Sequence, residues 1–222
     1  GSTSDQQGTK VDTSTNGGTT AFSTATEVAS ITVTAVNDAP TLTQGHVTTH
    51  ATTNEDTPSN GATSNVPYDS AGGADVDTGA LKGYAVTGTT GSGTWQYSSN
   101  GGVTWVNFGS VSNSNALLIG GATIRYLPGG NNGETATFTY RAWDRTTGTE
   151  STNAIPRYAS TDDNGGTTAF SSQTATRQIV VTSVNDAPIL DNTGHMTLTT
   201  ITEEQTTNGG QTVASIIASA GG

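Results

Sequence analysis

Alternating apolar and hydroxyl-bearing residues mark the clearest strands of this chain. Residues 29–35 (Ala-Ser-Ile-Thr-Val-Thr-Ala) alternate strictly, and residues 179–183 are a more apolar version of the same run. Residues 136–143 place Ala136, Phe138, Tyr140 and Ala142 on one face. A period of two is that of a half-buried β-strand. Shorter strands are predicted at 81–86, 94–98, 103–108, 116–119 and 122–127.

Six to eight short strands separated by Gly-, Asn- and Ser-rich turns predict an all-β fold. We expect a β-sandwich of two sheets. No segment has a convincing helical period over ten residues. Residues 211–219 are the one ambiguous segment. The segment that corresponds to it in the complete repeat described below contains Pro67.

Two tracts recur at an offset of 148 residues. Asn16–Phe22 (Asn-Gly-Gly-Thr-Thr-Ala-Phe) returns unchanged as Asn164–Phe170, and Ala35–Pro40 returns as Ser183–Pro188 with one substitution. Self-similarity at a fixed period is typical of a tandem array. A proline that directly follows a strand cannot join the strand ladder, so each Val-Asn-Asp-Ala-Pro tract is interpreted as a strand end followed by a short, stiff linker.

The period divides the chain into three expected parts. Residues 1–40 are interpreted as the end of one repeat, 41–188 as a complete repeat with its linker, and 189–222 as the start of the next. The expected neighbours of the complete repeat are therefore further copies of itself.

The charge balance is acidic, with 18 acidic and 7 basic side chains and a net charge of −11. Such a surface repels phosphates, which argues against a nucleic-acid partner, and it suits divalent cations. No apolar run is long enough to insert into a membrane. The chain has no cysteine, which excludes disulfides and thiolate metal sites, so bound metal is the expected substitute.

Oxygen-bearing side chains cluster at the linkers and in glycine-rich loops. Any one of them alone is a turn or capping residue of a solvated surface, and Asp144 is equally a ligand or a turn residue. Together they resemble the oxygen ligands that Ca²⁺ collects in sets of six to eight. The predicted metal ligands are Asn37, Asp38, Glu55, Asp56, Asp75, Asp77, Asp144, Asn185, Asp186, Glu203 and Glu204.

With these motifs the chain resembles the bacterial cadherin-like modules of giant surface proteins, including the tandem extender domains of repeats-in-toxin-type adhesins. The resemblance is carried by the linker Val36–Pro40 and its copy, by Glu55–Thr57, by Asp75–Asp77 and by the strand end Phe138–Asp144. It implies an immunoglobulin- or cadherin-like β-sandwich in an extracellular bacterial protein whose interdomain junctions bind Ca²⁺.

The resemblance also implies how the ligands are shared. Asn37 and Asp38 would share ions with Asp75 and Asp77. Glu55 would serve the other junction together with the pair Asn185 and Asp186. The sequence departs from a cadherin linker at Ala39 and Ala187, where a second asparagine would stand.

The expected function is that of a non-catalytic structural repeat that extends or assembles a large surface or adhesion protein. One alternative is a self-assembling extracellular filament or sheath subunit. The other is a glycan-binding adhesin module that uses Trp95, Tyr97 and Trp105, although these rings are also natural core or hairpin residues. The run Ser98–Trp105 is expected to form a tight turn.

No catalytic motif is present in the sequence. It contains no paired histidines on a helix, no nucleophile elbow and no glycine-rich phosphate loop. His46 and His50 are expected to be surface or strand-end residues rather than metal ligands. An enzyme is therefore not expected.

Overall fold

The computed structural model describes residue 8 and residues 10–50, 52–63, 65–189 and 196–218. The chain divides into two units, residues 1–36 and residues 37–222, which are described separately. Strands in two sheets dominate the second unit, so the predicted all-β fold is confirmed. In the described part of the chain, no helix has the length and apolar character needed to cross a bilayer.

The larger sheet is built around the longest strand, β9, which pairs antiparallel with β4 on one side and with β11 on the other. The strand order is β1-β11-β9-β4-β7-β10, and β2 also pairs with β11. Both β1 and β2 run parallel to β11. The bounds are β1 Val47–Thr49, β2 Thr53–Asn54, β4 Gly83–Thr90, β7 Ala116–Ile119, β9 Glu134–Trp143, β10 Tyr158–Ala159 and β11 Ala175–Thr182.

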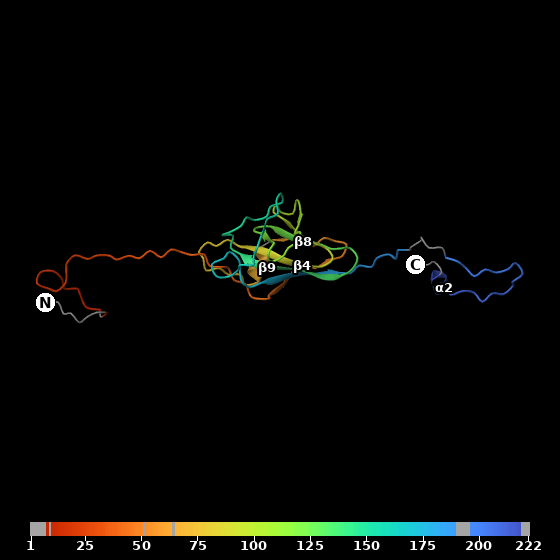
Figure 1. Ribbon diagram of the computed structural model, residues 1–222, viewed down its shortest axis with the longest axis horizontal. Coiled ribbons are helices and arrows are strands. Elements are labelled where there is room, and N and C mark those ends of the chain that lie inside the picture. Colours follow the sequence, from red (N-terminus) through yellow and green to blue (C-terminus); the bar gives the residue numbers. More distant parts are fainter. Residues whose placement is uncertain (1–7, 9, 51, 64, 190–195, 219–222) are drawn as a thin grey trace. The chain divides into compact units, whose positions relative to one another are not determined.

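The smaller sheet has the order β3-β8-β5-β6 and forms a second layer, with β8 separated from β4 and β9 (Figure 1). Its strands are β3 Ala62–Thr63, β5 Thr94–Ser98, β6 Val106–Asn107 and β8 Thr123–Leu127. All of its pairings are antiparallel.

Aromatic rings form the contact between the two layers. Phe138 of β9 meets Trp95 of β5 edge to face, with ring centroids 4.9 Å apart, and meets Phe108 at 5.7 Å. Trp95 also lies 4.9 Å from Tyr126 of β8, and Tyr84 of β4 stacks on Phe138 at 6.2 Å. Because the chain is poor in aliphatic residues, these large rings supply much of its buried apolar area.

Most strands lie where the alternation predicts them. Ala136, Phe138, Tyr140 and Ala142 are fully buried, as expected for one face of β9. The expected strand at 103–108 is reduced to the two residues of β6, because Gly101–Thr104 is part of a turn.

The prediction of a strand at residues 29–35 is wrong. These residues form no strand, and Ile31 and Val33 are 89% and 84% exposed. Their copy in β11 is held between β9 and the pair β1 and β2. A strand is stable only when its backbone groups pair with a neighbour, and residues 29–35 have no such neighbour among the residues that the structure describes.

Two short helices occupy matching places, α1 at Asn65–Ser70 and α2 at Val213–Ala218, whose first residues are 148 apart. Within the ambiguous segment 211–219, residues 213–218 are therefore helical, and residue 219 lies outside the described residues. Pro67 is tolerated because it lies in the first turn of α1, where a backbone N–H has no partner within the helix.

A buried histidine faces a buried arginine beside β11. His50, which directly follows β1, is 2% exposed, and Arg177 is 5% exposed. His50 Nε2 lies 2.8 Å from Asn60 O and must donate to it, so Nδ1 accepts from Arg177 Nε at 3.3 Å. Burial lowers the pKa of His50, and the Arg177 charge lowers it further, against the effect of the Asn60 hydrogen bond. His50 is therefore a strand-end residue, as expected, and lies in the core.

We expect the free energy of unfolding to decrease as the pH falls below about 6.5, the ordinary pKa of histidine. Because the pKa of His50 is lowered in the folded state, the unfolded chain binds the proton first, and the loss reaches about 1.4 kcal/mol per pH unit. Urea unfolding between about pH 7.5 and 5.5 measures it. His50→Gln, which keeps one donor and one acceptor, should abolish this part of the pH dependence, whereas His46→Gln should retain it. An equal dependence in both variants would contradict the assignment.

Candidate functional site

The linker tract that precedes the complete repeat lies against the end of β9 and the loop before β11. Asn37 Nδ2 donates to Asp144 Oδ2 at 2.9 Å and to the carbonyl oxygen of Thr168 at 3.2 Å. Two residues later, the N–H of Ala39 donates to Gly166 O at 2.8 Å. The linker is thus fixed to the folded domain by its own hydrogen bonds.

Asp38, Asp75 and Asp77 form a chain of backbone-to-carboxylate hydrogen bonds. The N–H of Asp38 donates to Asp77 Oδ2 at 2.8 Å, and the N–H of Asp77 donates to Asp75 Oδ1 at 2.9 Å. The segment is therefore bent at Asp77, not extended. The structure brings together the linker and the Asp-x-Asp pair, which lie 37 to 40 residues apart in the sequence.

One carboxylate oxygen at this end of the domain has no partner. Asp75 Oδ2 is buried, and no described residue donates a hydrogen bond to it. A buried carboxylate oxygen without a donor is costly unless a cation or water satisfies it. The arrangement fits a cation bound at Asp75, because oxygen ligands of opposite charge are what a hard divalent ion requires.

Asp144 closes the site from the end of β9. It is 3% exposed, and its Oδ1 accepts from Thr146 N at 2.8 Å and from Thr146 Oγ1 at 2.6 Å. Asp144 therefore stabilises the turn that follows β9 and also contacts the linker. Both of its oxygens already accept hydrogen bonds.

The carboxylates of this site are not neutralised by basic side chains. In the described ranges the side-chain ion pairs are Lys82–Asp69 and Arg145–Glu150, and neither involves the linker site. Burial raises the pKa of Tyr68 to about 12, with further contributions from the charges of Asp75, Asp69 and Asp144.

A second carboxylate with one buried oxygen that lacks a hydrogen-bond donor lies at the other end of the domain. Glu55, which follows β2, is 2% exposed, and its Oε1 accepts from the N–H of Val184 at 2.7 Å. Its own N–H donates to Thr182 O at 3.1 Å. Glu55 Oε2 is buried and finds no donor among the described residues. Glu55 is thus bound to the residues that lead directly into the second linker.

The remaining predicted ligands are exposed and are not gathered into either group. The described hydrogen bond of Asn185 runs from Nδ2 to the carbonyl oxygen of the next residue at 3.3 Å. Asp56 donates its N–H to Asn54 Oδ1 at 3.2 Å and has an exposed side chain. The exposed residues are Asp56, Asn185, Asp186, Glu203 and Glu204.

Acidic and histidine side chains do not form a ready-made metal cluster of three or more anywhere in the part of the chain that the structure describes. The linker site instead combines carboxylates with the amide of Asn37 and with backbone carbonyls of residues 166–168. Sequence reasoning missed these carbonyls, because any residue carries one. The exact recurrence of Asn164–Phe170 as Asn16–Phe22 was the signal that could have pointed to them.

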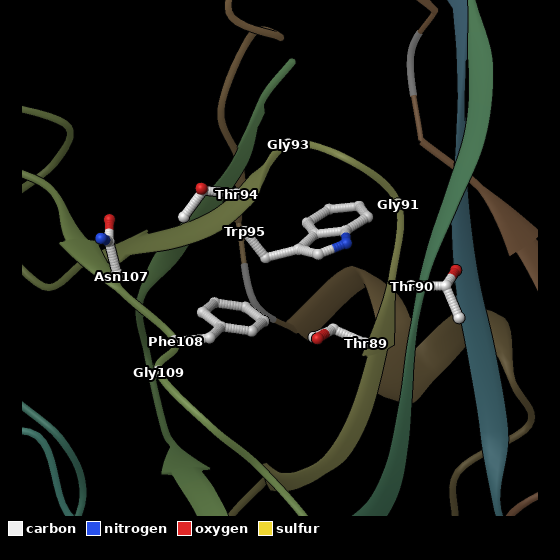
Figure 2. Close-up of a pocket in the computed structure, with 9 residues that line it drawn as sticks. All are labelled: Thr89, Thr90, Gly91, Gly93, Thr94, Trp95, Asn107, Phe108 and Gly109. Atoms are coloured by element: carbon white, nitrogen blue, oxygen red, sulfur yellow. The ribbon is translucent and has the colours of Figure 1, made fainter. Parts of the chain in front are cut away.

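The aromatic residues considered for glycan binding do not form an exposed platform. Tyr97 is fully buried and Trp95 is 3% exposed. Figure 2 shows the rings of Trp95 and Phe108 facing one another among the residues that line a pocket. The pocket has a volume of about 200 Å³, and the two ring centroids lie 6.3 Å apart in a stacked arrangement. Trp105 is half-buried, with the Arg125 guanidinium 4.1 Å from its ring centroid.

The run before Trp105 is the tight turn that the sequence predicts. Ser98 Oγ accepts from Gly102 N at 2.8 Å, and Asn100 Oδ1 accepts from Thr104 N at 3.0 Å. Gly101 and Gly102 have φ values of 72° and 90°, which glycine adopts without strain. These hydrogen bonds account for the motif as a structural turn.

Comparisons with protein-family models, with curated proteins and with solved structures give no match to this chain.

Proposed function

We propose that this chain is a non-catalytic structural repeat whose junctions bind Ca²⁺. The observation that carries the proposal is a pair of buried carboxylate oxygens without hydrogen-bond donors, Asp75 Oδ2 and Glu55 Oε2. Each belongs to a group in direct contact with a linker tract, Asp75 through Asp77 at the first tract and Glu55 at the second. Both ends of one domain therefore carry a buried carboxylate oxygen that a cation would satisfy.

Calcium suits this requirement better than magnesium. Ca²⁺ accepts six to eight oxygen ligands in adaptable geometry, whereas Mg²⁺ demands a strict octahedron and gives up its water reluctantly. Asp75 and Asp77 would hold the ion at the first junction. Glu55 would hold it at the second, and the exposed pair Asn185 and Asp186 of the following tract would turn toward the ion to complete that site. The bound ion supplies positive charge between carboxylates that otherwise repel one another.

The proposed biological role follows from repetition. A domain of the immunoglobulin- or cadherin-like sandwich type, repeated every 148 residues and joined by short proline-ended linkers, extends a large molecule away from a surface. Metal at the joints would stiffen the array. The acidic, cysteine-free composition is compatible with a secreted or surface-exposed bacterial protein that uses Ca²⁺ in place of disulfides.

A filament or sheath subunit is the second candidate, favoured by one observation. Ile31 and Val33 are each more than 80% exposed and alternate with hydroxyl-bearing residues, whereas their copies Ile179 and Val181 are buried in β11. An extended segment of this kind favours pairing with the sheet edge of another chain. Electron microscopy after addition of Ca²⁺ separates the candidates: polymers would favour the filament, and dispersed particles the joint-stiffening repeat.

Calcium should raise the thermal stability of the chain. A ligand present at 100 times its dissociation constant stabilises the folded state by about 2.7 kcal/mol, which for a protein of this size raises Tm by about 5–10 °C. Differential scanning calorimetry after chelation, then with millimolar Ca²⁺ or Mg²⁺, measures the effect. Mg²⁺ should give a much smaller shift. Identical melting curves in chelator and in Ca²⁺ would rule the proposal out.

Neutralising the carboxylate of Asp75 or of Glu55 should weaken calcium binding at the junction to which that residue belongs. Asp75→Asn and Glu55→Gln keep the size of each side chain but remove a negative ligand, so each should lose one class of binding sites in calorimetric titration, by about tenfold or more in affinity. Asp163→Asn, at an exposed loop carboxylate, removes the same charge and should leave both classes intact. Equal weakening in all three variants would show only a general effect of net charge.

A further inference from the structure

The recurring tract Asn164–Phe170 forms a loop with its own hydrogen bonds. The N–H of Gly165 donates to Phe170 O at 2.7 Å, and the N–H of Thr168 donates to Gly165 O at 3.1 Å. Gly165 and Gly166 have φ values of 73° and 57°, in the left-handed region that glycine adopts without penalty. The consecutive glycines therefore allow the chain to reverse within a few residues.

The copy of this tract adopts the same conformation in the separate unit of residues 1–36. The N–H of Gly17 donates to Phe22 O at 2.8 Å, the N–H of Thr20 donates to Gly17 O at 3.1 Å, and Gly17 and Gly18 have φ values of 75° and 56°. Residues 29–35, which follow this copy, do not form their strand. The loop is therefore encoded by its own seven residues and does not need the sheet beside it.

In the complete repeat this loop presents carbonyl oxygens to the preceding linker. Asn37 Nδ2 lies 3.2 Å from Thr168 O and 3.4 Å from Thr167 O, and Gly166 O accepts from the N–H of Ala39. Three consecutive residues of the loop thus accept hydrogen bonds from two linker residues, Asn37 and Ala39. Asp144 Oδ2, at 2.9 Å from the same Nδ2, completes the acceptor set.

We infer that the Asn-Gly-Gly-Thr-Thr-Ala-Phe loop, with Asp144, is a docking surface for an Asn-Asp-Ala linker segment, and that the Asn37 amide determines its specificity. The occupant in this chain is Asn37–Ala39. The loop of each repeat would in the same way receive the linker that precedes that repeat, so the two recurring tracts are the two halves of one interdomain contact.

The chemistry of the acceptor set explains why the linker carries asparagine. Asp144 and the loop carbonyls offer only acceptors, and an amide NH₂ supplies two donors to them. An aspartate at position 37 would bring a second carboxylate against Asp144 and the carbonyls with nothing to donate. The contact consists of direct hydrogen bonds, so it does not depend on the proposed calcium.

Hydrogen exchange on the full chain tests this inference. The N–H groups of Asp38 and Ala39 are hydrogen-bonded when the linker is docked, and their exchange can be followed by NMR in Ca²⁺ and in chelator. Asn37→Asp should accelerate both by about tenfold or more in either condition, equivalent to a loss of about 1.4 kcal/mol of docking energy. Asn37→Ala should act in the same direction by a smaller factor, because it removes the donors without adding charge.

Asn185→Asp is the matched control, since it makes the same change in the copied tract, where the described contact of Asn185 is with its own neighbour. It should leave exchange at Asp38 and Ala39 unchanged. If Asn37 served as a calcium ligand through its oxygen, Asn37→Asp would keep protection in Ca²⁺ and lose it in chelator, and the docking inference would be wrong. Unchanged exchange in both Asn37 variants would also overturn it.

Failure of the docking inference and failure of the calcium proposal are distinguishable. The calcium proposal is decided by the Tm shift and by the titrations of Asp75→Asn and Glu55→Gln. The docking inference is decided by exchange at the linker amides in the absence of calcium.

Discussion

Packing around Phe138 is the interaction on which the rest of this structure depends. Its ring meets Trp95 and Phe108 across the two layers and stacks with Tyr84 on its own sheet. Aromatic pairs of this kind add about 0.5–1.5 kcal/mol each beyond their buried area. The strand that carries Phe138 pairs with both β4 and β11 and ends directly before Asp144. The core therefore also fixes the position of the carboxylate that receives the linker.

Two different kinds of interaction are expected at the linkers, namely hydrogen bonds and cation binding. The hydrogen bonds of Asn37 and Ala39 are neutral donors to an acceptor-rich surface, and they set where the linker lies. The carboxylates of Asp75 and Glu55 each leave one buried oxygen unsatisfied, which is a charge requirement that hydrogen bonds within the described residues do not meet. Direct docking would set the geometry of a joint, and a bound cation would add stiffness to it. These proposed roles are separable, because the docking would persist in chelator and the cation's contribution would not.

The two copies of the repeat motif behave differently for a physical reason. The glycine loop keeps the same hydrogen bonds and left-handed glycines in both copies, because the hydrogen bonds that close it lie within its own seven residues. The alternating run 29–35 has the pattern of β11 yet forms no strand, because strand formation needs backbone partners far away in the sequence. Local contacts reproduce a structure wherever the sequence recurs, whereas sheet pairing depends on the neighbours present.

The sequence alone determined the all-β class, the face of β9 that is buried and the places of most strands, because period-two alternation is a local signal. Resemblance, rather than geometry, also led to the expectation that Asn37 and Asp38 lie near Asp75 and Asp77, and hydrogen bonds link Asp38, Asp77 and Asp75 in the structure. Only the tertiary structure decided that Asp56 and the second linker pair are exposed, that His50 is buried against Arg177, and that loop carbonyls hold Asn37. These outcomes depend on which backbone groups converge after the sheets pack, and every residue carries the same backbone groups.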